Sequence, residues 1–207
     1  MAYIFIHGSG QTSSSWDETM SYMTNISKIS CPEVFLLLEG KEANYINLYS
    51  AFVEYCNNFS ESLNLCGLSL GGILALNYAI DYPQKVKTLV LICTPHKILS
   101  IIFEIQTIIF RLLPKSFFNK FGLQKNDMFK LANSMKNLDF STKLKNITCS
   151  TLIICGSKDS INMKSAKYLS ENIQGANIRI IKNTGHVINE ENPKILALEL
   201  ESFYKQS

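Results

Sequence analysis

The sequence predicts an α/β protein built on a mostly parallel sheet of about six strands flanked by helices. Short apolar segments with strand character alternate along the chain with segments of helical periodicity, as is typical of parallel sheets. Three apolar runs are unbroken, as expected for strands covered on both faces: Val34–Leu38, Thr88–Ile92 and Leu152–Ile154. The chain has 207 residues, of which 46% are apolar, so we expect 1–207 to form a single domain around one core.

Each expected element follows from its residue pattern. Strands are expected at about 2–6, 33–38, 62–67, 87–93, 149–155 and 177–182. Helices are expected at about 15–28, 44–59, 70–82, 161–173 and 193–205. Ser15 and Glu18 have the spacing of a capping box, which would begin the first of these helices. In the last helix one face is apolar, which indicates ordinary core packing: Leu196, Leu200, Phe203 and Tyr204.

The segment 95–146 interrupts this alternation, and we expect it to be an inserted helical lid. Between Ile98 and Leu113 the polar residues form one narrow stripe at helical spacing: Ser100, Glu104, Thr107 and Arg111. A helix this apolar must be buried on most sides, form a dimer or meet lipid. We expect no stable membrane span, because Glu104 and Arg111 interrupt a stretch that is too short to cross a bilayer. A homodimer through the lid stays open.

Composition limits the partners and the compartment. The net charge of +3 and the lack of a basic cluster give no reason to expect nucleic-acid binding. Of the six cysteines, four lie in or beside apolar runs, where a thiol behaves as a small hydrophobic group: Cys66, Cys93, Cys149 and Cys155. No C-x-x-C spacing occurs, so neither a metal nor redox chemistry is expected. With no visible secretion signal, we expect a reduced, cytoplasmic protein.

The strongest functional signal is Gly67-Leu68-Ser69-Leu70-Gly71. G-x-S-x-G between an apolar strand and a helix is the pattern of a nucleophile elbow. Such a turn holds the hydroxyl clear of the backbone and close to a helix N-terminus, whose N–H groups favour a developing oxyanion. The alternative is a glycine-flanked serine that caps an ordinary helix.

A serine nucleophile needs a base, and that base needs an orienting acid. His186 directly follows the last expected strand, so its loop would reach the same sheet edge as Ser69. Asp159 follows the strand at 149–155 and can accept a hydrogen bond from the histidine. The alternative for His186 is a histidine in a surface loop, and the alternative for Asp159 is a helix N-cap. We expect Ser160 to serve as that cap instead.

The loop His7-Gly8-Ser9-Gly10 follows the first strand. Its two glycines allow a close approach of the backbone to a ligand, so the N–H groups of Ser9 and Leu70 can together bind an oxyanion. His7 is expected to hold this loop rather than to act as a base. His96, at the lid boundary, is expected to have no role.

Together these motifs resemble the α/β-hydrolase family. The matching marks are His7-Gly8, the turn around Ser69, Gly156-x-x-Asp159, Gly185-His186 and the closing Glu191-Asn192-Pro193. The order Ser, Asp, His is the one expected of that fold. The resemblance covers nearly the whole chain and is weakest in the lid.

Two departures from the family pattern stand out. The chain begins at what would be the third strand of the family, so we expect the usual leading hairpin to be absent. After Leu38, Glu39-Gly40-Lys41-Glu42 replaces the Pro-Gly-His-Gly type of turn that is common in relatives. This second departure affects one wall of the pocket rather than the triad.

The expected function is that of a serine hydrolase that cleaves carboxylic esters, in which Ser69 attacks, His186 is the base and Asp159 orients it. The apolar lid favours a small-molecule ester or thioester with a hydrophobic acyl or alkyl group. No cofactor is expected. Thioesterase, C–C hydrolase and peptidase chemistry stay open, as do a non-catalytic module that binds a small ligand and a lipid-surface or dimerisation protein.

Overall fold

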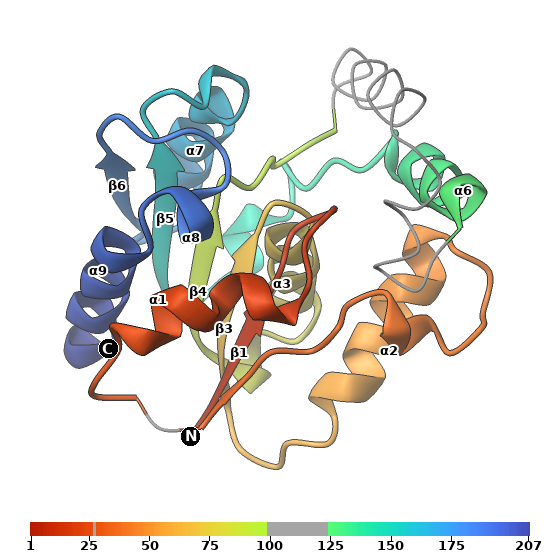
Figure 1. Ribbon diagram of the computed structural model, residues 1–207, viewed down its shortest axis with the longest axis horizontal. Helices are drawn as coiled ribbons and strands as arrows, with labels where there is room; N and C mark the ends of the chain where they lie inside the picture. The colour runs from red at the N-terminus through yellow and green to blue at the C-terminus, as the bar shows by residue number, and fades with distance from the viewer. Residues whose placement is uncertain (27, 99–123) are drawn as a thin grey trace.

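A six-stranded sheet forms the centre of the computed structural model, which describes residues 1–26, 28–98 and 124–207 (Figure 1). The strands are β1 (Ala2–Ile6), β2 (Ile29–Ser30), β3 (Leu63–Leu68), β4 (Val86–Ile92), β5 (Ser150–Gly156) and β6 (Asn177–Ile181). Their order across the sheet is β2-β1-β3-β4-β5-β6, and each neighbouring pair is parallel. All strands therefore end at the same edge of the sheet.

Helices cover both faces of this sheet. The longer ones are α1 (Asp17–Ser21), α2 (Tyr45–Cys56), α3 (Leu70–Asp81), α6 (Lys125–Met135), α7 (Ser160–Asn172) and α9 (Pro193–Gln206). The short ones are η1 (Ser13–Trp16), η2 (Leu36–Leu38), η3 (Pro83–Lys85), η4 (Leu144–Asn146) and α8 (Ile188–Glu191). In Figure 1, α1 crosses in front of the central strands and α3 lies behind them. The expected helices at 44–59, 70–82, 161–173 and 193–205 are confirmed to within a few residues.

Aromatic contacts hold η1 and α9 against β1. Tyr3 of β1 meets Tyr204 of α9 edge-on, with ring centroids 5.0 Å apart. Phe5, two residues further along β1, meets Trp16 of η1 in the same way at 5.2 Å. Because residues two apart on a strand share a face, these contacts place η1 and α9 on one side of the sheet.

The strand expected at 33–38 is wrong. The strand at this edge is the two-residue β2, while Leu36–Leu38 forms the 3-10 turn η2, in which Leu36 is 59% exposed. The N–H of Val34 donates to His7 Nε2 at 3.1 Å, so a side chain occupies the backbone group that a sheet ladder would use. Length and hydrophobicity alone do not separate a strand from another buried segment.

The first expected helix, at 15–28, is also wrong in extent and in its cap. The chain forms η1 and then α1, which ends at Ser21, and in the described part of the chain the N-cap side chain of neither element makes a capping hydrogen bond. Instead of forming a capping box with Glu18, the Ser15 hydroxyl is buried and has no hydrogen-bond partner among the described residues. Beyond α1, a carboxylate oxygen of Glu201 accepts the backbone N–H groups of Thr24 and Asn25.

The described part of the segment 95–146 contains α6 and η4. Helix α6 packs on α2, and the N–H of Tyr45 donates to the Ser134 hydroxyl at 2.8 Å. The apolar helix expected between Ile98 and Leu113 lies outside the described residues, apart from Ile98 itself. In the ranges that the structure describes, no helix is both long and apolar enough to cross a membrane.

Candidate active site

Ser69 occupies a sharp turn between β3 and α3, as the sequence predicts. Its backbone has φ +53° and ψ −110°, a conformation that residues other than glycine rarely adopt. Its N–H donates to the Ile92 carbonyl at 2.9 Å, and its carbonyl accepts from the N–H of Ile73 at 2.9 Å. One side of the turn is thus tied to β4 and the other begins the helix. Strain held in this way is concentrated at functional sites.

Glycines allow the close packing of this turn. A Cβ added at Gly71 would lie 2.1 Å from the Ile6 carbonyl oxygen, and one at Gly67 would lie 2.3 Å from the Gly71 carbonyl oxygen. Both distances are far below van der Waals contact. The start of α3 therefore lies directly against the end of β1, and Leu70 is the first helical residue there.

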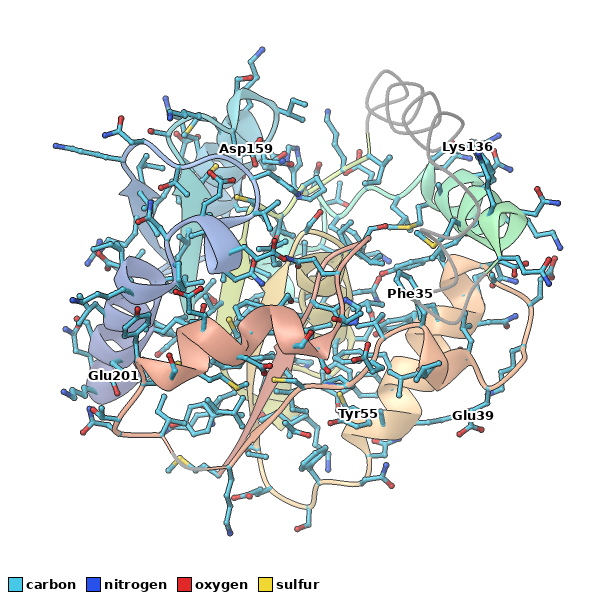
Figure 2. The ribbon with its side chains drawn as sticks, viewed as in Figure 1. Phe35, Glu39, Tyr55, Lys136, Asp159 and Glu201 are labelled. Atoms are coloured by element: carbon cyan, nitrogen blue, oxygen red, sulfur yellow. The ribbon has the colours of Figure 1, made fainter. Side chains whose placement is uncertain are left out.

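Asp159 lies at the start of α7, beyond the end of β5 (Figure 2). Its Oδ2 accepts a hydrogen bond from His186 Nδ1 at 2.7 Å, while its Oδ1 accepts from the N–H of Asn162 at 3.1 Å. The carboxylate thus orients the histidine and caps the helix at the same time. The expectation that Ser160 would serve as the cap is wrong, because two oxygens let one side chain fill both roles.

Asn162 is a member of this site that the sequence reasoning missed. Its Nδ2 donates to Asp159 Oδ1 at 3.1 Å and to Oδ2 at 2.9 Å. Burial alone would raise the pKa of Asp159, but the hydrogen bonds from His186 and Asn162 outweigh it and lower the pKa to about 2. The carboxylate is therefore ionised at neutral pH. The position of Asn162 three residues after an N-cap was the available signal.

The loop that carries His186 is fixed by Glu191. One carboxylate oxygen accepts the N–H of Gly185 at 2.7 Å, and the other accepts the N–H of Val187 at 3.2 Å. The backbone on both sides of the histidine is therefore held by a single side chain. From the sequence, Glu191 is visible only as part of the closing pattern Glu191-Asn192-Pro193.

The loops after β5 and β6 also bind each other directly. The N–H of Lys158 donates to the Thr184 carbonyl at 2.9 Å, next to the site residue Asp159. A Cβ added at Gly156 would lie 2.1 Å from the Gly185 carbonyl oxygen, so the two backbones are in close contact. This packing brings His186 to Asp159, although the two residues are 27 positions apart.

The loop after β1 forms a turn from Gly8 to Gln11, closed by a 3.2 Å hydrogen bond from the Gln11 N–H to the Gly8 carbonyl. Gly10 has φ +85°, which the third position of a type II turn requires. Ser9 is the second residue of this turn and is half-buried. The loop thus ends at the same sheet edge as Leu70.

Gln11, which the sequence reasoning also missed, joins this loop to the region after His186. Its Oε1 accepts the N–H of Gly8 at 3.1 Å. Its Nε2 donates to Asn189 Oδ1 at 3.1 Å and to Glu190 Oε1 at 2.7 Å. The first loop and α8 are therefore held at a fixed spacing.

The other two histidines are buried structural groups. His7 Nδ1 bonds the Gly8 carbonyl at 2.9 Å, and burial lowers its pKa, so the neutral ring holds the loop as the sequence predicts. His96 Nδ1 bonds the Ser165 hydroxyl at 2.9 Å, and its ring stacks on Tyr168 at a centroid distance of 4.2 Å. The contact of His96 with α7 gives it a packing function.

The sites that the sequence predicted separately are thus gathered along one edge. Asp159 and His186 are in direct contact, while Ser69 and Leu70 follow β3, which β4 separates from β5. Ser9 lies beyond β1, on the other side of β3. An all-parallel sheet places functional groups from several strands at its carboxyl edge, outside the strand ends.

Comparison with known proteins agrees with this architecture. A family model described as "alpha/beta hydrolase fold" matches residues 60–113, which include β3, the Ser69 turn and α3. The pimeloyl-[acyl-carrier protein] methyl ester esterase of Wigglesworthia glossinidia brevipalpis is 26% identical over an alignment of 244 residues. That alignment covers 98% of this chain and 93% of the relative.

Solved structures show the same fold. An α/β-hydrolase enzyme from a Medee basin deep-sea metagenome library superposes with a TM-score of 0.80 and 20% identity, over 100% of this chain and 90% of the other. A hydrolase from Pseudomonas aeruginosa superposes with a TM-score of 0.78 and 17% identity, over 98% of this chain and 89% of the other. The strands and helices described above therefore follow an established arrangement.

Proposed function

This chain belongs to the α/β-hydrolase superfamily of enzymes, and on that premise we propose that it is a serine hydrolase that cleaves carboxylic esters. The observation that carries the proposal is the 2.7 Å hydrogen bond between His186 Nδ1 and Asp159 Oδ2, at the sheet edge where Ser69 stands in a strained turn. The bond from Nδ1 leaves Nε2 as the nitrogen that can take a proton from the serine hydroxyl.

In the proposed reaction, Ser69 Oγ attacks the ester carbonyl carbon while His186 takes its proton. Asp159 stabilises the imidazolium that forms, because the carboxylate is ionised and fixed by Asn162. The proton then passes to the leaving alcohol, and an acyl-enzyme remains. Water, deprotonated by His186, attacks the acyl carbon and releases the acid and the free serine.

The negative oxygen of each tetrahedral intermediate would be bound by two backbone N–H groups. Leu70 supplies one from the first turn of α3, where N–H groups point out of the helix end. Ser9 would supply the other from the turn that Gln11 closes. The ties from Gln11 to α8 support this assignment, because they hold the donor loop against the region that follows His186.

For the substrate, we propose an ester or thioester with an aliphatic acyl chain. The name of the Wigglesworthia relative, a pimeloyl-[acyl-carrier protein] methyl ester esterase, supports a methyl ester on an acyl chain. The apolar residues of the segment 95–146, which we propose to be a lid over the site, support a hydrophobic group as well.

Labelling with a fluorophosphonate probe tests this function most directly. The wild-type protein is expected to react at Ser69, and Ser69→Ala is expected to abolish both labelling and the hydrolysis of p-nitrophenyl esters. A series of graded acyl lengths, assayed alongside acyl thioesters and a methyl ester, then identifies the substrate class. If Ser69 is not labelled and Ser69→Ala hydrolyses esters like the wild type, the proposal fails and a ligand-binding module remains.

A further inference from the structure

Three potential metal ligands lie together in the described part of the chain, and one of them is Asp159 of the proposed catalytic pair. Residues Ile92 and Ile154 are paired in the register of β4 and β5. Cys93 directly follows the end of β4, and Cys155 is the next residue on β5. Both cysteines are fully buried. Their two Sγ atoms and a carboxylate oxygen of Asp159 all lie within 4.8 Å of one another.

The backbone and the protons of these thiols distinguish them from ordinary core cysteines. Cys93 has φ +46°, a region that side chains beyond glycine rarely adopt, and its N–H donates to the Ile154 carbonyl at 2.8 Å. The Cys155 thiol donates to the Gly156 carbonyl at 3.6 Å.

We propose that Cys93, Cys155 and Asp159 form a binding site for a thiophilic divalent metal ion, represented by Zn²⁺ or Cd²⁺. Thiolates select such metals, and a carboxylate is a regular third ligand of zinc. Two ligand atoms bound to one zinc ion lie about 3.8 Å apart, so a spread of 4.8 Å needs only small side-chain movements. Binding releases the two thiol protons to solvent, which leaves three anionic ligands around the ion.

The site depends on both thiolates. Asp159 caps α7, and the amino end of a helix carries partial positive charge that opposes a cation. One thiolate and one carboxylate would balance the charge of the ion but supply only two ligands, whereas the second thiolate completes a three-ligand set. This departs from the sequence expectation of no metal, which rested on the spacing of cysteines along the chain rather than across strands.

Metal binding would compete with the histidine for the same carboxylate. Asp159 Oδ2 accepts from His186 Nδ1, and the side chain of Asp159 is only 4% exposed beneath a histidine side chain that is 41% exposed. An ion that draws Asp159 toward the sulfurs removes the group that orients His186, so it inhibits the enzyme. This inhibition rests on the proposed function, whereas the binding itself does not.

Cadmium titration of the reduced full-length protein tests the binding, because cadmium thiolates absorb in the ultraviolet by charge transfer. The half-buried thiols of Cys31 and Cys149 are first replaced in a Cys31→Ser/Cys149→Ser background, so that they cannot contribute. This background is expected to bind one Cd²⁺ per chain. Cys93→Ala and Cys155→Ala are each expected to weaken binding at least tenfold, whereas Cys56→Ala, a buried cysteine in α2, is expected to leave it unchanged.

Thermal melts establish that each variant is folded, and Cys93→Ser and Cys155→Val serve as second variants where alanine leaves too large a cavity. An absent cadmium band in the background protein overturns the proposal. So does a band that persists in folded variants of both Cys93 and Cys155.

Inhibition is measured as the rate at which fluorophosphonate labels Ser69. Zn²⁺ is expected to slow labelling at least tenfold in the background protein, a chelator is expected to restore it, and Cys155→Ala is expected to label normally with or without Zn²⁺. Cysteine-dependent cadmium binding in a protein that never labels would support the metal site and refute the serine hydrolase. Labelling of Ser69 without cadmium binding would support the serine hydrolase and refute the metal site.

Discussion

The carboxylate of Glu191 holds the backbone of the His186 loop from both sides, through the N–H groups of Gly185 and Val187. No other contact in the described part of the chain holds both neighbours of the histidine in this way. The position of His186 relative to Asp159 therefore depends on a residue that follows His186 by five positions.

Glu191→Ala is expected to lower kcat/KM for an ester substrate about tenfold, because hydrogen bonds to a charged group contribute about 1.5–3 kcal/mol and an exposed pair lies at the low end. Ester hydrolysis and thermal unfolding are measured together. Glu54→Ala, which removes an exposed glutamate on α2, is the matched control and is expected to behave like the wild type. Equal activity of the two variants would show that the loop holds its position without Glu191.

Asn162→Ala is expected to lower kcat about tenfold with little change in KM, since Asn162 positions Asp159 rather than the substrate. Loss of its hydrogen bonds should also raise the pKa of Asp159 from about 2, which NMR titration of the carboxyl group can measure. Asn172→Ala, at the other end of α7, is the control. An unchanged kcat would contradict a positioning role.

Gly71→Ala is expected to destabilise the fold by about 3 kcal/mol or more, because the new Cβ would lie 2.1 Å from the Ile6 carbonyl oxygen. Gly175→Ala is the control: Gly175 has φ +72° with open space around it, so only backbone strain of about 1 kcal/mol is expected. Urea unfolding measures both. Similar losses for the two variants would mean that β1 and α3 can separate easily.

His7 is expected to make stability depend on pH. Burial lowers its pKa below the ordinary 6.5, so the unfolded chain binds the proton more readily than the folded one. Its contribution is fully present above pH 6.5 and is lost as the pH falls toward the lowered folded value.

Urea unfolding from neutral pH down to about pH 5 should therefore show a steeper loss for the wild type than for His7→Gln. His96→Gln is tested in parallel, because the pKa of His96 is also lowered, mainly by burial. Parallel curves for wild type and His7→Gln would contradict the assignment of a neutral buried ring.

The sequence was most informative where the local pattern and the tertiary environment agree. Leu63–Leu68 and Leu70–Asp81 were predicted almost to the residue, because an apolar run, two glycines and a helical periodicity all favour the same strand, turn and helix. The positions of Ser69, Asp159 and His186 at one sheet edge followed from their places just after expected strands, since parallel strands end together.

Errors arose where a distant residue decides the local structure. The apolar Val34–Leu38 run is kept out of the sheet by the contact of Val34 with His7, from the end of another strand. The first helix stops early, and Glu201, near the end of the chain, binds the backbone just beyond it. No local sequence pattern predicts such contacts between distant residues. Asn162, by contrast, lies three residues after the N-cap Asp159, a spacing that is visible in the sequence.

Because of the strand order, Ser69 and His186 lie beside parts of the sheet that differ in their resistance to local unfolding. Ser69 follows β3, a central strand that is buried along its whole length, whereas His186 follows β6, an outermost strand that is mostly exposed. Backbone amides of β3 should therefore exchange with solvent only in global unfolding, whereas those of β6 should exchange through local openings that require less free energy. On warming, the enzyme should lose activity reversibly when β6 and the His186 loop detach from the sheet, while Ser69 remains in the folded core.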